Sequence, residues 1–162
     1  MNIFKLILLG CLSMCLNISG QTVENTCWNE TKSNKTMDSN FYISKGKRLL
    51  EWNKEKLTSQ SNLSVNDIKE LFNPEFVVMA NGRKYNANYQ NYFEFLNKFR
   101  SDIDTIDYDV QEYLNMESTV VMPLKATVKR IRGKVDIFDA ILLIKFNDSG
   151  KIVHWQEVYS IR

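Results

Sequence analysis

The C-terminal stretch that decides the fold reads Asp136-Ile-Phe-Asp-Ala-Ile-Leu-Leu-Ile-Lys-Phe146, then Asn147-Asp-Ser-Gly150, then Lys151-Ile-Val-His-Trp-Gln-Glu-Val-Tyr-Ser-Ile-Arg162. Its alternation predicts two antiparallel strands, 136–146 and 152–161, joined by a tight turn. Period two places Val153, Trp155, Glu157 and Tyr159 on one face of the second strand. A carboxylate between two aromatic side chains indicates a polar group in an apolar pocket, and it leaves the ligand open.

Residues upstream extend this sheet. Alternation predicts a long strand over 106–116, with Tyr108 and Glu112 on one face, and a further strand over 120–130. Short turns between neighbours predict an antiparallel meander. On strand 136–146, Ile137, Ile141 and Leu143 lie opposite Phe138 and Leu142. A strand that is apolar on both sides needs cover on both sides, so we expect a homodimer through the sheet.

Apolar residues at helical spacing predict three helices: Phe41–Thr58, a second from a capping box at Ser64 to Pro74, and Tyr89–Arg100. A short strand, Glu75–Ala80, ends at the turn Asn81-Gly82. The predicted fold class is therefore α+β, a cone-shaped α+β barrel with three N-terminal helices packed on a curved antiparallel sheet.

The predicted domain is residues 41–162, after a signal peptide at 1–20 and a flexible polar tail at 21–40. Lys5 precedes an apolar run, Leu6–Leu16, that is shorter than a membrane span, so we expect a secreted or periplasmic protein. An uncleaved anchor and lipid attachment at Cys11 are the alternatives. Cleavage would leave only Cys27, so no internal disulfide is expected.

Composition excludes several classes of function. The 162 residues carry a net charge of +2 with both signs interspersed, which argues against nucleic-acid binding. No membrane contact is expected after signal cleavage. The single histidine, His154, is expected on the outer side of the sheet. Metal-ligand spacing and a glycine-rich phosphate loop are both absent from the sequence.

The order of elements resembles the nuclear transport factor 2-like superfamily, in its SnoaL-like branch. The best local marks are Asn81-Gly82 after the first strand and the segment Gly150–Tyr159, which is similar to polyketide cyclases and limonene-epoxide hydrolases. The resemblance covers residues 41–162 and implies the cone fold. The superfamily holds isomerases, cyclases, hydrolases and binding proteins, so the resemblance alone does not select an activity.

The catalytic pattern of the epoxide hydrolases is incomplete. Glu157 falls where they place an acid that activates water, but Gln156 replaces their arginine. Their second acid and its arginine would lie within 122–127, which contains no Asp, Glu or Arg. Their tyrosine and asparagine would fall near Val78 and Ala80, where only Asn81 is close. Epoxide hydrolysis is therefore not expected.

We carry three hypotheses forward. The first is an exported domain that binds a small apolar or aromatic molecule, with Glu157 as polar anchor and with walls made by Trp52, Tyr92, Phe138, Trp155 and Tyr159. The second is an isomerase, cyclase or hydratase that needs no cofactor and uses Glu157 as general acid or base, with Glu112 as a second carboxylate if it points inward. The third is a protein-interaction or dimerisation module. The alternative for Glu157 is a role without chemistry. Its carboxyl group would then accept a hydrogen bond from a pocket tyrosine or lie in solvent at the end of the strand.

Overall fold

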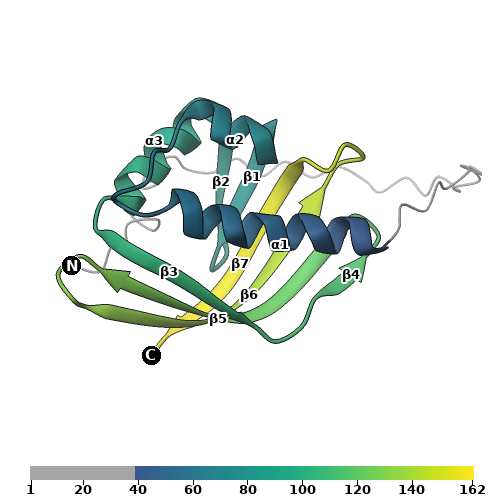
Figure 1. Ribbon diagram of the computed structural model, residues 1–162. Helices are drawn as coiled ribbons and strands as arrows, with labels where there is room; N and C mark the ends of the chain where they lie inside the picture. Colours follow the sequence, from purple (N-terminus) through teal and green to yellow (C-terminus); the bar gives the residue numbers. More distant parts are fainter. Residues whose placement is uncertain (1–38) are drawn as a thin grey trace, which may run out of the picture. The chain divides into compact units, whose positions relative to one another are not determined.

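The computed structural model describes residues 39–162, which form one α+β domain. The predicted signal segment and nearly all of the predicted tail lie outside the described residues. The elements run, in chain order, α1 (Ser39–Lys56), α2 (Val65–Leu71), β1 (Phe72–Ala80), β2 (Arg83–Asn88), α3 (Tyr89–Arg100), β3 (Ile103–Val110), β4 (Leu114–Met116), β5 (Thr119–Arg130), β6 (Val135–Phe146) and β7 (Ile152–Ile161). Figure 1 shows the three helices on one side of the curved sheet.

Side-chain caps fix where two helices begin. The Ser64 backbone N–H donates to Asp67 Oδ2 at 2.8 Å, and the Asp67 N–H donates back to Ser64 Oγ at 3.3 Å. Asn88 Oδ1 accepts from the N–H groups of Gln90 and Asn91, both at 3.0 Å. These bonds satisfy amide groups that have no partner inside a helix. The predicted bounds of α3 are confirmed, and α2 ends before Pro74, at Leu71, because β1 begins at once.

The sheet has the order β2-β1-β7-β6-β5-β3, and β4 also pairs with β5. The prediction of a purely antiparallel meander is wrong at one place, because β1 and β7 are parallel. The chain leaves β1 through β2 and α3 and returns to it only as the last strand. Strand β2 was missed because its residues are mostly polar. It pairs with β1 through Asn81 and Gly82, whose φ values of 47° and 81° suit a tight hairpin turn.

The predicted strand 106–116 is broken into β3 and β4. Val110 faces Leu124 and Leu114 faces Val121, so residues 111–113 oppose only Met122 and Pro123 on β5. Pro123 has no N–H to donate, and the extra residue leaves the ladder as a bulge. The prediction of a continuous strand through Glu112 is therefore wrong. Glu112 lies in this break and is exposed, so the hypothesis of an inward second carboxylate fails and the solvent-facing alternative holds.

The two faces of the sheet differ in burial. On β6, Phe138 and Leu142 are buried beneath the helices, whereas Ile141 is 53% exposed on the other face. The predicted division of this strand into inner and outer residues is confirmed. The helices thus cover only the inner face, and any site inside the cone must be built from inward side chains of β1, β3, β5, β6 and β7 together with α1 and α3.

Candidate functional site

Glu157 lies on the inner face of β7, level with Leu142 of β6 and Ala80 of β1. Its side chain shares this face with Trp155, whose Nε1–H donates to Glu157 Oε2 at 3.1 Å. Asn81, at the end of β1, fixes the backbone here. The Asn81 N–H donates to the Glu157 carbonyl at 2.9 Å, and its side chain bonds the Tyr159 N–H and carbonyl at 2.9 and 3.2 Å. The turn that closes β1 therefore also holds the acid in place.

Burial dominates the chemistry of this acid. Loss of hydration raises the pKa of Glu157 from 4.5 to about 7, and the hydrogen bond from Trp155 offsets only part of that rise. Desolvation penalises the charged form of a carboxyl group. Glu157 is therefore divided between its charged and neutral forms at neutral pH, where it can both accept and release a proton.

Tyrosine side chains face the same interior. Burial raises the pKa of Tyr92 on α3, and the negative charge of Glu157 raises it further. Tyr108 on β3 behaves similarly, because burial and the charge of Glu157 raise its pKa against the lowering effect of Asn53. Burial and then Glu157 also raise the pKa of Tyr159. At neutral pH these phenols keep their protons and can donate hydrogen bonds towards a ligand.

Helix α1 adds two buried polar side chains, Trp52 at 1% and Asn53 at 2% exposure. Asn53 Nδ2 donates to Tyr108 Oη at 3.1 Å, which leaves the Tyr108 proton available for another acceptor. Asn53 Oδ1 and Trp52 Nε1 have no hydrogen-bond partner among the described residues. A buried polar atom without a partner costs about 1–3 kcal/mol, so each such atom calls for a ligand or water that completes it.

The inner face also carries two alanines among large side chains. Ala126 on β5 lies between Tyr108 and Phe138, and Ala140 on β6 lies between Leu124 and Tyr159. Both alanines keep partial solvent access, although they point inward, and so does Glu157. We infer from this partial access that the inner face leaves a recess beside Ala126 and Ala140.

The predicted wall residues are distributed over α1, α3, β6 and β7. Trp52, Tyr92, Phe138 and Trp155 are buried, and Tyr159 is half-buried. The Phe138 and Tyr159 rings meet edge to face at 5.8 Å. Glu112, by contrast, is exposed in the segment between β3 and β4.

The sequence interpretation missed Asn53 and Tyr108 as site residues. Alternation places Tyr108 on the same strand face as Ile106, which indicates an inward position, but nothing in the sequence pairs Tyr108 with an asparagine of α1.

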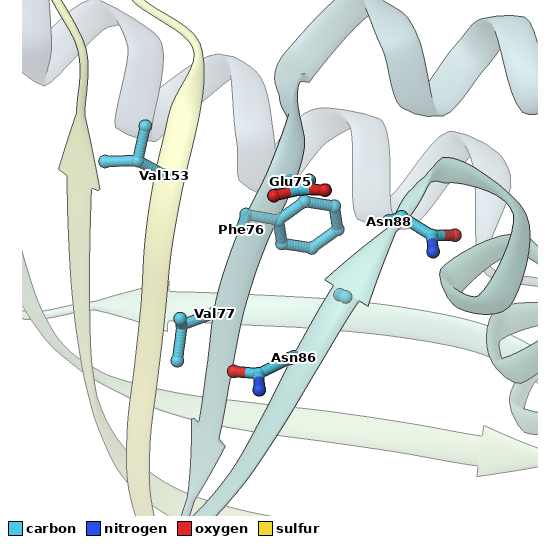
Figure 2. Close-up of a pocket in the computed structure, with 7 residues that line it drawn as sticks. Glu75, Phe76, Val77, Asn86, Asn88 and Val153 are labelled. Atoms are coloured by element: carbon cyan, nitrogen blue, oxygen red, sulfur yellow. The ribbon is translucent and has the colours of Figure 1, made fainter.

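A hollow of about 410 Å³ lies over β1, β2 and β7. Figure 2 shows Val77 beside Asn86, with Glu75, Asn88 and Val153 above them in the view. Val153 lines this hollow together with Val77, whereas Ile152 is buried. The prediction that Val153 lies beside Trp155 on the inner face is therefore wrong. The cause is a register shift, because Phe72 pairs with Ile152 but Val77 pairs with His154.

Among the residues 39–162, no group of three His, Cys, Asp or Glu side chains is arranged to hold a metal ion.

Comparison with solved structures places this architecture among NTF2-like proteins. An NTF2-like protein of unknown function from Exiguobacterium sp. 255-15 superposes with a TM-score of 0.58 at 17% identity, over 72% of this chain and 98% of its own. A protein of Jannaschia sp. CCS1, provisionally assigned as a SnoaL-like polyketide cyclase, gives 0.59 at 11% identity, over 82% and 91%. An LEH-like epoxide hydrolase of M. tuberculosis gives 0.55 at 10% identity, over 72% and 84%.

At these identities the likeness establishes the fold alone. The chain therefore has the NTF2-like fold that its sequence resembled. No protein-family model matches the sequence, and no curated protein matches it either.

The raised pKa of Glu157 makes stability depend on pH. The folded state binds this proton more tightly than the unfolded state, so the free energy of unfolding should fall as pH rises from about 4.5 to about 7. Because Glu157 keeps some solvent access, we expect a loss of about 2 kcal/mol, below the full value of its shift. Glu157→Gln should therefore be more stable than wild type at pH 8 and nearly equal to it at pH 4.5, measured by urea unfolding.

Glu112→Gln is the matched control for this experiment, since it removes an exposed carboxylate with the same change of atoms. It should leave the free energy of unfolding unchanged at both pH values. A Glu157→Gln effect of equal size at pH 4.5 and pH 8 would show that Glu157 has an ordinary pKa.

Proposed function

We propose that this protein binds a small, uncharged apolar or aromatic molecule inside the cone. Two observations carry the proposal. Tyr108, which accepts a hydrogen bond from Asn53, is close enough to Glu157 for the charge of Glu157 to raise its pKa. Asn53 Oδ1 and Trp52 Nε1, on adjacent residues of α1, are buried without a hydrogen-bond partner among the described residues. Small-molecule sites are usually lined by many apolar side chains and a few polar groups. The small side chains of Ala126 and Ala140 leave room for the ligand.

The arrangement of these polar groups favours a ligand that is neutral and carries one oxygen that can accept a hydrogen bond. An anionic ligand would repel the Glu157 carboxylate and raise its pKa further. A neutral ligand with one carbonyl or hydroxyl oxygen can instead accept a hydrogen bond from the Tyr108 O–H, which Asn53 leaves available. Its apolar body would pack against Phe138 and Trp155, both of them buried.

Binding is tested with 2-naphthol, a neutral aromatic probe, after native mass spectrometry for a retained ligand. The probe should bind the wild type, and Ala126→Leu should weaken binding about tenfold or more, because the larger side chain fills the recess. Thr127→Leu, on the opposite face of the same strand, is the control and should bind normally. Titration calorimetry gives the affinities, and thermal unfolding checks that both variants fold. Equal affinities for all three proteins would place the probe outside the recess.

The pKa of Glu157, about 7, favours a second candidate function, proton transfer on such a ligand without a cofactor. The carboxylate would take a proton from the carbon next to a ketone, and the electron pair would move to the oxygen as an enolate. Tyr108 would donate a hydrogen bond to that oxygen. The Glu157 carboxyl would then return a proton to carbon, as an isomerase or cyclase requires.

This second candidate predicts hydrogen exchange at the C1 position of 2-tetralone in D2O, followed by proton NMR. Wild type should exceed the buffer rate, and the rate should rise with pH through about 7, because the carboxylate is the base. Glu157→Gln should lose the acceleration by roughly a hundredfold, and Glu112→Gln should keep it. If Glu157→Gln still accelerates the exchange of 2-tetralone as wild type does, proton transfer by Glu157 is contradicted and binding stays the proposed function.

We further propose that the chain is exported to the periplasm or the medium, on the basis of Lys5, the apolar run Leu6–Leu16 and the small residues before Gln21. Among the described residues, no helix is long and apolar enough to span a membrane. Expression in a bacterial host followed by mass spectrometry should find a secreted or periplasmic chain that starts at Gln21. An intact chain inside the cell, or a lipid-bearing chain that starts at Cys11, would contradict this.

A further inference from the structure

The hollow over β1, β2 and β7 lies on the face of the sheet opposite to Glu157 (Figure 2). On β1, Ala80 is level with Glu157 and faces inward, so alternation turns Val77 outward. Val77 lines the hollow. We call this place the outer hollow. It is separate from the recess beside Ala126, and an inference about it does not rest on the proposed function.

Two irregularities of the sheet accompany the outer hollow, one on each side of β7. On β1, residues 73–76 oppose only Val153, because the pairing shifts there. The β6 ladder likewise skips Val153, since it passes from Ile152 to His154. Such bulges bend a strand away from its neighbour and are over-represented next to functional sites. The hollow is thus a feature of the backbone and does not depend on the rotamer of one side chain.

Three polar side chains line the outer hollow from two strands. Glu75 is the cross-strand partner of Asn88, and Asn86 is the partner of Val77. Partners share a face of the sheet with Cβ atoms about 5 Å apart, and so do residues two positions apart. One carboxylate and two amides therefore surround an apolar floor made by Val77 and Val153.

Most of the hydrogen-bonding capacity of these three side chains is unused within the chain. The side chains of Glu75 and Asn86 have no hydrogen-bond or ion-pair partner among residues 39–162. Asn88 Oδ1 accepts from the N–H groups of Gln90 and Asn91, but its Nδ2 has no partner in that range. The outer hollow thus offers carboxylate oxygens that accept, and amide groups that donate as well as accept.

The first turn of α3 holds the two asparagines in place. The Asn88 N–H donates to Asn91 Oδ1 at 2.9 Å, and Asn91 Nδ2 donates to the Asn86 carbonyl at 3.4 Å. These bonds fix the end of β2 before any ligand binds. Groups that are already ordered lose less entropy on binding, which favours a real, if weak, affinity.

The lining of the outer hollow disfavours charged ligands. None of the described residues that line it is a lysine, arginine or histidine, and the Glu75 carboxylate repels anions. An ammonium group could pair with Glu75, but an exposed ion pair contributes little, and the amide donors would find no acceptor on it. A neutral ligand with neighbouring hydroxyl groups satisfies all three side chains, because each hydroxyl both donates and accepts.

We propose that the outer hollow binds a monosaccharide ring or a similar neutral polyol. The Glu75 carboxylate accepts hydrogen bonds from two neighbouring hydroxyls, and the amides of Asn86 and Asn88 donate to hydroxyl oxygens. The C–H face of the ring packs on Val77 and Val153. The volume, about 410 Å³, falls within the range of about 300–1,000 Å³ that small-molecule sites have. An exposed site of this kind implies a dissociation constant on the order of 1 mM.

The first test is a titration of the 15N-labelled protein with the methyl glycosides of glucose, galactose and mannose, each up to about 50 mM. At least one glycoside should give saturable shifts of the amide signals of Glu75, Val77, Asn86 and Val153. Butylammonium and acetate should give none. If no glycoside saturates, or if butylammonium or acetate saturates these signals in place of a glycoside, the proposal is overturned.

The second test uses variants with matched controls, after thermal unfolding has shown that each one folds. Glu75→Gln should weaken glycoside binding by roughly fivefold to tenfold, and Asn86→Ala by roughly threefold to tenfold, because each loses hydrogen bonds to the sugar. Glu112→Gln and Asn62→Ala make the same or a similar change at exposed positions between other elements and should bind normally. Equal affinities for all of these proteins would contradict the proposed site.

The variant Ala126→Leu separates this inference from the proposed function. It fills the recess on the inner face and should leave glycoside binding unchanged, whereas Glu75→Gln should leave the binding of 2-naphthol unchanged. Glycoside binding that Ala126→Leu abolishes would place the sugar in the recess and would overturn the outer site.

Discussion

The removal of the Glu157 carboxyl from water is the constraint on which the rest of the site depends. An ionised carboxylate inside protein is costly unless it is paired, and the indole N–H of Trp155 offsets the burial only in part, so the pKa rises to about 7. Packing of the cone elsewhere must outweigh this cost. Groups held at such a disadvantage cluster at functional sites, which is why the acid, rather than the fold alone, supports a function.

The fold keeps the acid in place through contacts far apart in sequence. Asn81 binds the backbone of β7 at Glu157 and Tyr159, while α1 brings Asn53 against Tyr108 of β3. The first contact depends on the parallel pairing of β1 with β7, and the second depends on α1 lying over the inner face of the sheet. The inner face is therefore closed within one chain. The outer face is not, since Ile141 and Val158 remain exposed.

Much of this architecture follows from local pattern. Period two placed Glu157 beside Trp155, and helical spacing with a cap at Asn88 bounded α3, because both signals act within a few residues. What the sequence did not reveal depends on distant partners. Strand β2 is polar and pairs only because β1 lies beside it. Glu112 leaves the ladder because Pro123, on another strand, cannot donate. Asn53 becomes a site residue only where Tyr108 meets α1.

The most direct measurement is the pKa of Glu157 itself, followed through the carboxyl carbon signal of protein labelled with 13C-glutamate and assigned by its loss in Glu157→Gln. The account predicts one glutamate that titrates near 7, well above the ordinary value of 4.5. Titration of every glutamate below pH 5 would mean that the Glu157 carboxyl group is hydrated, and would contradict both the inferred recess and the functions proposed for it.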